Sequence, residues 1–262
     1  MDLGLAGKVA LVAAGSKGLG RAVAEELAAE GATVAICARG QAAIDETVTA
    51  MSERGPRALG ITSDVSVPGE PERVVAETLR VFGRIDILVT NSGGPKAGRV
   101  ESLAAEDWDA ATRILLSSVV GFVRAALPGM RERRWGRILN ITSIAAKQPI
   151  DGLVLSNSLR MAVIAYARTL ANEVATDGIT VNNLLPGYTR TERVVDLAEQ
   201  MAVTGGITPA EFIGRWEAEI PMHRIGEPRE FAAAAAFLAS ERASYITGQS
   251  LAIDGGWIRA LM

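Results

Sequence analysis

The chain alternates short apolar runs with longer segments whose apolar residues recur at helical spacing. Residues 8–15 read KVALVAAG, a run without polar alternation, which is typical of a parallel strand covered on both faces. Further strands are predicted at 33–39, 58–66, 85–94, 136–143, 179–187 and 248–256. Residues 21–31 read RAVAEELAAEG and predict a helix that stops at the glycine. Further helices are predicted at about 41–54, 71–82, 107–130, 153–176 and 228–240.

This order of elements predicts the fold class. Strands alternate with helices along most of the chain, which indicates an α/β fold of Rossmann type: a doubly wound, parallel seven-stranded sheet with helices on both faces. The length of 262 residues fits one domain, 1–262. A polar, glycine-bearing stretch at 188–221 breaks the alternation, and we expect it to be an irregular, mobile lid over the substrate.

Composition narrows the class of protein. The net charge of −3 argues against nucleic acid as a partner. The single Cys37 excludes a disulfide framework and a four-cysteine zinc site, and no metal site is expected. No basic segment precedes a long apolar stretch near the N-terminus, and the longest apolar run, Phe231 to Ala239, has nine residues, whereas a membrane span needs about 20. We therefore expect a soluble cytoplasmic protein without a membrane partner.

A glycine-rich turn lies between the first predicted strand and the first helix. Residues 13–21 read AAGSKGLGR, and at such a turn backbone N–H groups and the helix N-terminus bind phosphate. An acidic residue at the end of the second strand would favour NAD, but Arg39 stands there, and Lys17 lies in the turn itself. Both cations suit a 2′-phosphate, so NADP(H) is favoured over NAD(H). The alternative is that both are solvated surface cations.

Several motifs in order along the chain resemble those of the short-chain dehydrogenase/reductase family, close to its 3-oxoacyl-(acyl carrier protein) reductase branch. The family's TGxxxGxG is AAGSKGLG here, with Ala13 and Ala14 in place of Thr and the first Gly, and PGYTRT and YITGQSLAIDGGW follow later. The resemblance implies a homodimer or homotetramer built on the helices at 107–130 and 153–176. It also implies a set of cofactor-binding residues: Gly15, Ser16, Lys17, Gly18, Leu19, Gly20, Arg39, Asp64, Val65, Asn91, Ser92, Gly93, Arg160, Pro186, Gly187, Thr189 and Thr191.

The resemblance places the family's active-site tetrad of Asn, Ser, Tyr and Lys at Leu115, Ser143, Ser156 and Arg160. Only Ser143 is retained. A serine hydroxyl is a weaker acid than a phenol, which has a pKa near 10, and it is a ring's length shorter. Arg160 keeps the positive charge and the ribose hydrogen bond but stays protonated, so it cannot relay a proton as lysine does. Leu115 cannot hold the relay water.

Two other residues are candidates for the role of the missing phenol as proton donor. Tyr188 follows the PG motif near the nicotinamide end, although an aromatic residue there is more simply part of the pocket wall. Lys147 lies with Asp151 in the loop after Ser143 and would act as an electrophile or general acid if burial lowered its pKa; the alternative is a solvated loop lysine. We interpret His223 as structural and Cys37 as part of the core.

Three hypotheses for the function remain open from the sequence. The first is an NADP(H)-dependent oxidoreductase acting on a small carbonyl or hydroxyl substrate, with catalytic candidates Ser143, Ser156, Arg160 and Lys147. The second is a hydrolase, lyase or dehydratase on the same scaffold. The third is a catalytically silent, nucleotide-binding member. The fold alone does not decide among them.

Overall fold

A computed structural model describes residues 2–53 and 55–260. Its centre is a parallel seven-stranded sheet in the order β3-β2-β1-β4-β5-β6-β7. The strands are β1 Val9–Ala13, β2 Thr33–Ala38, β3 Ala58–Thr62, β4 Ile87–Thr90, β5 Gly136–Ile141, β6 Ile179–Pro186 and β7 Ser250–Ile253. The predicted doubly wound α/β fold is confirmed. The strand order reverses between β1 and β4, and such a reversal opens a crevice at the carboxyl ends of the strands.

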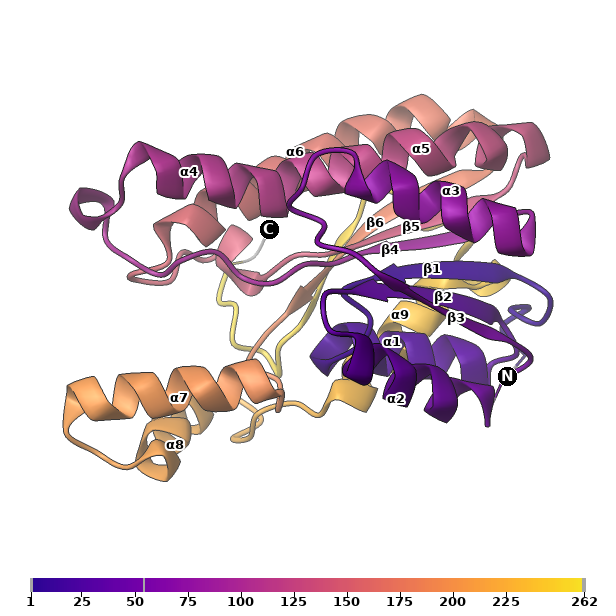
Figure 1. Cartoon of the computed structure of the whole chain (residues 1–262). Helices are drawn as coiled ribbons and strands as arrows, with labels where there is room; N and C mark the ends of the chain where they lie inside the picture. Colours follow the sequence, from indigo (N-terminus) through magenta and orange to yellow (C-terminus); the bar gives the residue numbers. More distant parts are fainter. Residues whose placement is uncertain (1, 54, 261–262) are drawn as a thin grey trace.

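Helices cover both faces of the sheet (Figure 1). Helices α1 Gly18–Ala29, α2 Gln41–Ser52 and α9 Pro228–Ala239 pack on one face and share one apolar core with it. Helices α3 Glu70–Phe82, α5 Ser118–Arg133 and α6 Val154–Val174 pack on the other face around a second core. Burial on both faces explains why the strand sequences show apolar runs without polar alternation.

The helix expected at 107–130 is present as one continuous helical stretch that contains a π-helical turn. Helix α4 Ala105–Thr112 leads into a π-helical turn, Arg113–Ser117, before α5 begins. The stretch Ala105–Glu132 is the one part of the described chain whose length and mean hydropathy of 1.5 would allow it to cross a membrane. Its residues Phe122 and Met130 are nevertheless buried in the second core, against the sheet. The apolar residues of this helix therefore pack in the protein interior.

The segment at 188–221 is helical, which corrects the expectation of an irregular stretch. It forms α7 Glu192–Gly205 and α8 Pro209–Glu219, a helical pair that Figure 1 shows set apart from the sheet in orange. Helix α8 starts with a capping box, in which the Thr208 hydroxyl accepts from the Glu211 N–H and Thr208 N–H donates to the Glu211 carboxylate. The sequence TPAE carries the signature of this capping box. The charged residues and glycines around it obscure the helical periodicity of the segment in the sequence.

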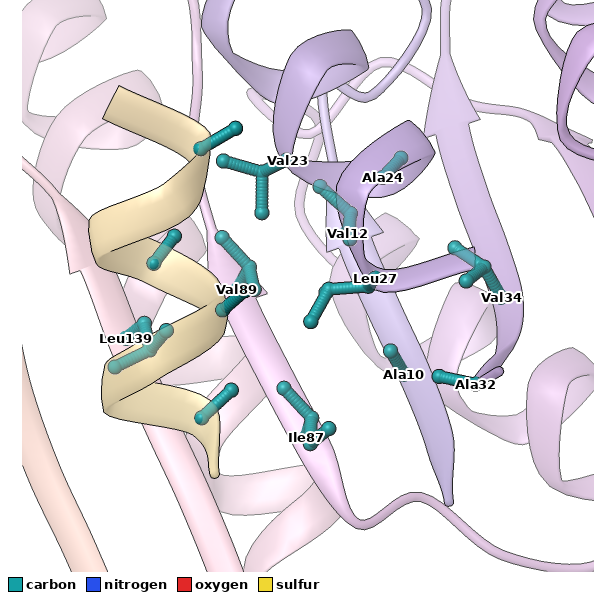
Figure 2. Packing of buried hydrophobic residues seen from close by; sticks show 14 of the residues in the cluster. Ala10, Val12, Val23, Ala24, Leu27, Ala32, Val34, Ile87, Val89 and Leu139 are labelled. Carbon is teal, nitrogen blue, oxygen red and sulfur yellow. The ribbon is translucent and has the colours of Figure 1, made fainter. Parts of the chain in front are cut away.

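The first core joins segments distant in the sequence. Figure 2 shows Val23, Ala24 and Leu27 of α1 meeting sheet residues such as Val12 and Val89, with the yellow helix α9 beside them. These side chains interlock between the two helices and the sheet, and they hold α1 in place. Because α1 begins at the glycine-rich turn, this packing fixes the position of the turn.

Substitution of the two phenylalanines of α9 tests how much this core packing stabilises the protein. Phe231 is 1% exposed within the first core and Phe237 is 38% exposed on the same helix. We expect Phe231→Ala to lower the free energy of unfolding by about 3–5 kcal/mol, because a large buried side chain leaves a cavity. Phe237→Ala is the matched control and should cost below about 1 kcal/mol. Urea denaturation measures both, and equal losses would contradict the packing described.

Candidate active site

The glycine-rich turn joins the end of β1 to the start of α1. Gly18 adopts a positive φ of 54°, a conformation that glycine tolerates without strain. A Cβ on Gly20 would overlap the Ala14 carbonyl oxygen, so the turn needs glycine there as well. The N-cap residue Lys17 makes no side-chain capping bond to α1. The first N–H groups of this helix are therefore without a side-chain cap, as at a helix N-terminus that binds an anion.

A cavity of about 770 Å³ extends from this turn across the carboxyl ends of the strands. Most of the residues selected from the sequence line it: Ser16, Lys17, Gly18, Leu19, Arg39, Asp64, Val65, Asn91, Ser92, Gly93, Ser143, Ser156, Arg160, Pro186, Gly187, Thr189 and Thr191. Gly15 and Gly20 lie behind this wall and support the turn, since Gly15 N–H donates to the Cys37 carbonyl at 3.1 Å. Lys147 does not line the cavity.

Arg39, one of the two cations expected near the adenosine end, directly follows β2. Arg39 is exposed and has no carboxylate partner among the described residues. Next to it, the Asp64 carboxylate accepts from Ser66 Oγ at 2.7 Å and from Ser66 N–H at 3.0 Å. These bonds, with help from the charge of Arg39, lower the pKa of Asp64. The carboxylate is thus held by the loop, and Arg39 is left available to a ligand.

Lys17 has a different environment from the one expected. Its ammonium donates to the Glu192 carboxylate at 2.7 Å, which links the glycine-rich turn to the first residue of α7. This hydrogen bond and the charge of Glu192 raise the pKa of Lys17. Both side chains are exposed, and exposed pairs contribute little to stability. Arg39 is therefore the cation of the adenosine end that forms no ion pair with a described residue, although the charge of Asp64 lies near it.

Three of the tetrad positions meet at the other end of the cavity. Ser143 follows β5, and its Oγ accepts from the Ala145 N–H at 3.1 Å. Ser156, near the start of α6, is 8% exposed, and its hydroxyl has no hydrogen-bond partner in the described part of the chain. One turn later, Arg160 Nη1 donates to the Ile141 carbonyl at 3.1 Å. Burial, followed by repulsion from Arg193, lowers the pKa of Arg160 to about 10.

Arg193 is a site residue that the sequence reasoning missed. It comes from the first turn of α7 and lines the same cavity as Arg160. Its guanidinium lies against Gly94 in the loop after β4, so that a Cβ at Gly94 would overlap it. The available signal was a second arginine two residues after the PGYTRT motif, within a segment that we expected to be irregular.

The remaining tetrad position, Leu115, lies in the π-helical turn and is 3% exposed. A hydrophobic side chain thus fills a helical irregularity of a kind that often marks a functional site. The leucine side chain offers no hydrogen-bonding group at this position.

The candidate substitutes for the missing phenol are placed as follows. Tyr188 lines the cavity and stacks on Trp216 with ring centroids 4.4 Å apart and planes at 17°, and Trp257 meets it edge-on at 6.0 Å. Burial raises the pKa of Tyr188 to about 12, so this phenol is a weaker acid than usual. Asp151 is exposed outside the cavity lining. The structure therefore favours Tyr188 as part of the wall.

The other reactive residue types lie outside the site. His223 is exposed with a positive φ of 52° and does not line the cavity. Cys37 is fully buried in β2, where burial raises the pKa of its thiol to about 12. Within residues 2–53 and 55–260, no three His, Cys, Asp or Glu side chains gather as a metal site would require.

The chain is similar over almost its whole length to known reductases. The family model described as Enoyl-(Acyl carrier protein) reductase matches residues 13–258. The 3-oxoacyl-(acyl-carrier-protein) reductase FabG of Vibrio cholerae is 34% identical over 97% of this chain and 98% of its own. Dehydrogenase/reductase SDR family member 4 of Oryctolagus cuniculus is 35% identical over 96% of this chain and 94% of its own.

Solved structures agree with these sequence relatives. L-sorbose reductase from Gluconobacter frateurii, complexed with NADPH and L-sorbose, superposes with a TM-score of 0.95 at 33% identity and covers 100% of both chains. A variant of actinorhodin polyketide ketoreductase with NADPH gives a TM-score of 0.92 at 32% identity, over 97% of this chain and 98% of its own.

The glycine-rich turn itself offers a test, because Ala14 has a φ of 48°, in the left-handed region. That conformation costs a non-glycine residue about 1–2 kcal/mol, while glycine adds about 0.5–1 kcal/mol of unfolded-state entropy. We therefore expect Ala14→Gly to raise the free energy of unfolding by about 0.5 kcal/mol. The control Ala13→Gly, in the buried strand β1, should lower it by about 1 kcal/mol. Equal destabilisation of both variants in urea denaturation would contradict strain at Ala14.

Proposed function

The chain belongs to the short-chain dehydrogenase/reductase family of oxidoreductases and has ketoreductases among its relatives; on that premise we propose that it is an NADP(H)-dependent carbonyl reductase with an atypical site of Ser143, Ser156 and Arg160. The substrate class is a carbonyl or hydroxyl compound of the 3-oxoacyl kind. One observation carries this proposal: a single cavity joins the glycine-rich turn and Arg39 to Ser143 and Arg160.

The residues present fit a phosphorylated nicotinamide cofactor. The uncapped start of α1 and the close-packed Gly20 provide a phosphate cradle. Arg39 lines the cavity and offers a planar donor set that no ion pair with a described residue occupies, which suits a 2′-phosphate. Structural relatives complexed with NADPH support this preference. When bound, the cofactor supplies the hydride.

The protein's own groups act on the carbonyl oxygen. Ser143 provides a hydroxyl donor just after β5. Arg160 provides a positive charge at the carbonyl of Ile141, the last residue of the same strand. Together they polarise the carbonyl and stabilise the negative charge that develops on its oxygen. The pKa of Arg160, lowered to about 10, matches the ordinary value of the phenol that Ser156 replaces. The guanidinium is thus a cation throughout the neutral range.

The surroundings of the site extend the proposal. We take α7 and α8 as the lid over the substrate, since residues 192–194 and 196–197 of α7 form one wall of the cavity. By the same resemblance, the chain is proposed to be a cytoplasmic homodimer or homotetramer that acts on a small molecule.

Arg39 tests the cofactor preference. We expect Arg39→Ala to raise the Kd for NADPH by about 10- to 100-fold, because charge-assisted hydrogen bonds to the 2′-phosphate are lost. The Kd for NADH should change by less than about threefold, since that cofactor lacks the 2′-phosphate. Isothermal titration calorimetry measures both. Arg57→Ala removes an exposed arginine outside the cavity and is the control; an unchanged NADPH affinity in Arg39→Ala would contradict the preference.

The missing phenol tests the proposed chemistry. We expect Ser156→Tyr combined with Arg160→Lys to raise kcat for NADPH-dependent carbonyl reduction by about 10²- to 10⁴-fold, the usual contribution of a general acid. The cavity beside Ser156 gives the ring space. Ser156→Phe with Arg160→Lys adds the same bulk without the hydroxyl and should bring no gain. The decrease in NADPH absorbance measures turnover.

The same assay separates the alternatives. Wild-type turnover of a carbonyl panel should require added NADPH. Turnover that persists without nucleotide would indicate a hydrolase or lyase instead. Bound NADPH with no turnover in the wild type or in the Tyr/Lys variant would indicate a silent, nucleotide-binding member.

A further inference from the structure

We propose that Arg160 of α6 and Arg193 of α7 together bind a carboxylate that the substrate carries beside its reducible carbonyl. This proposal rests on the proposed carbonyl reduction and adds the class of substrate to it. Two guanidiniums from different helices line one cavity. The fold brings Arg193, which is distant from Arg160 in the sequence, close enough for its charge to act on Arg160.

The charges at this end of the cavity are not balanced within the described chain. Arg160 has the Ile141 carbonyl as its hydrogen-bond partner, and Arg193 has no ion pair with a described residue. The two are close enough for the positive charge of Arg193 to disfavour the charged form of Arg160. Arg160 is half-buried and Arg193 is exposed, and an anion between two such like charges would offset their repulsion.

The acids of the cavity wall do not supply that anion. Asp64 is held by Ser66, and Glu192 is paired with Lys17. The third, Asp196, forms no ion pair with a described residue, and its charge acts on Lys17. All three serve the adenosine side or the mouth of the cavity, so the arginine pair is left for a ligand.

The strand order places the arginine pair on the substrate side of the site. The glycine-rich turn follows β1, whereas Gly94, beneath Arg193, follows β4, and Ile141, which accepts from Arg160, ends β5. The phosphate cradle and Arg39 lie on the β1 and β2 side of the sheet. Arg160 therefore lies at the end of the strand that Ser143 follows, and Arg193 lies over the loop after the neighbouring strand, on the side where the carbonyl is proposed to bind.

Gly94 gives Arg193 its place. A Cβ at this position would overlap the guanidinium of Arg193, and Gly94 does not have a left-handed φ. Alanine is therefore compatible with the backbone there and would displace the flexible end of Arg193 while leaving its charge in the protein. This provides a variant that moves the arginine without removing it.

Guanidinium groups match the proposed ligand. Each presents planar parallel donors that bind both oxygens of a carboxylate. An anion between the two arginines would offset their repulsion and connect α7 to α6 across the substrate. Ser143 would remain available to the carbonyl oxygen.

The test uses acetoacetate and pyruvate with their methyl esters, which keep the carbonyl and lack the charge. At saturating NADPH, we expect kcat/KM of the wild type to favour each acid over its ester by at least about tenfold. This preference should fall to near one in Arg193→Met and in Gly94→Ala. Arg190→Met removes an arginine of the same segment that pairs with Glu227 at 3.1 Å outside the cavity lining, and it should keep the preference.

Binding measurements separate this proposal from the proposed reaction. Calorimetry of acetoacetate and pyruvate with the protein–NADP⁺ complex reports carboxylate binding without turnover, and NADPH titrations report the cofactor. Binding of the acids that is lost in Arg193→Met, without turnover in any variant, would support the arginine site and reject the reductase. Equal turnover of acids and esters, or no measurable binding of either acid, would overturn the arginine site. So would a loss in Arg193→Met of NADPH affinity alone, because the arginine would then serve the cofactor.

Discussion

The sheet is buried on both faces, and this constraint determines where chemistry is possible. Apolar cores cover one face with α1, α2 and α9 and the other with α3, α5 and α6. Polar groups that need access to a ligand are therefore confined to the strand ends, and the reversal of order between β1 and β4 opens space at the carboxyl end. The packing that stabilises the fold also positions α1, and with it the glycine-rich turn. Residues separated by more than a hundred positions in sequence meet in one cavity for this reason.

The resemblance to the family places Ser156, Leu115 and Arg160 where other members carry a Tyr, an Asn and a Lys, and the structure shows the environment of each. Ser156 lines the cavity, and Leu115 is buried in the π-helical turn. Arg160 lines the same cavity, and burial lowers its pKa to about 10. A guanidinium remains a cation throughout the neutral range. On this assignment the site lacks the phenol as a proton donor and keeps a positive charge.

The regular part of the fold could be predicted from the sequence because it depends on local patterns. Apolar runs gave the seven strands, and the glycine-rich turn with the motifs after it gave most of the residues that line the cavity. Three features depended on tertiary contacts and were missed. Arg193 becomes a site residue because α7 folds over Gly94. Lys17 pairs with Glu192, which is distant in sequence. The π-helical turn interrupts a segment whose periodicity reads as one helix.

The helical pair α7–α8 is attached unequally at its two ends, and this bears on how the proposed lid would move. Near α8, Tyr188 stacks on Trp216, Phe212 meets Trp216 edge-on at 4.9 Å, and Trp257 closes the cluster. Each such aromatic pair contributes about 0.5–1.5 kcal/mol beyond the area it buries. At the start of α7, the link to the glycine-rich turn is the exposed pair of Lys17 and Glu192, which is worth little in water. Motion that opens the cavity would therefore break the ion pair first and leave the aromatic cluster intact. Since Arg193 directly follows Glu192, that motion would carry the guanidinium away from Gly94, and an anion bound to both arginines would oppose it.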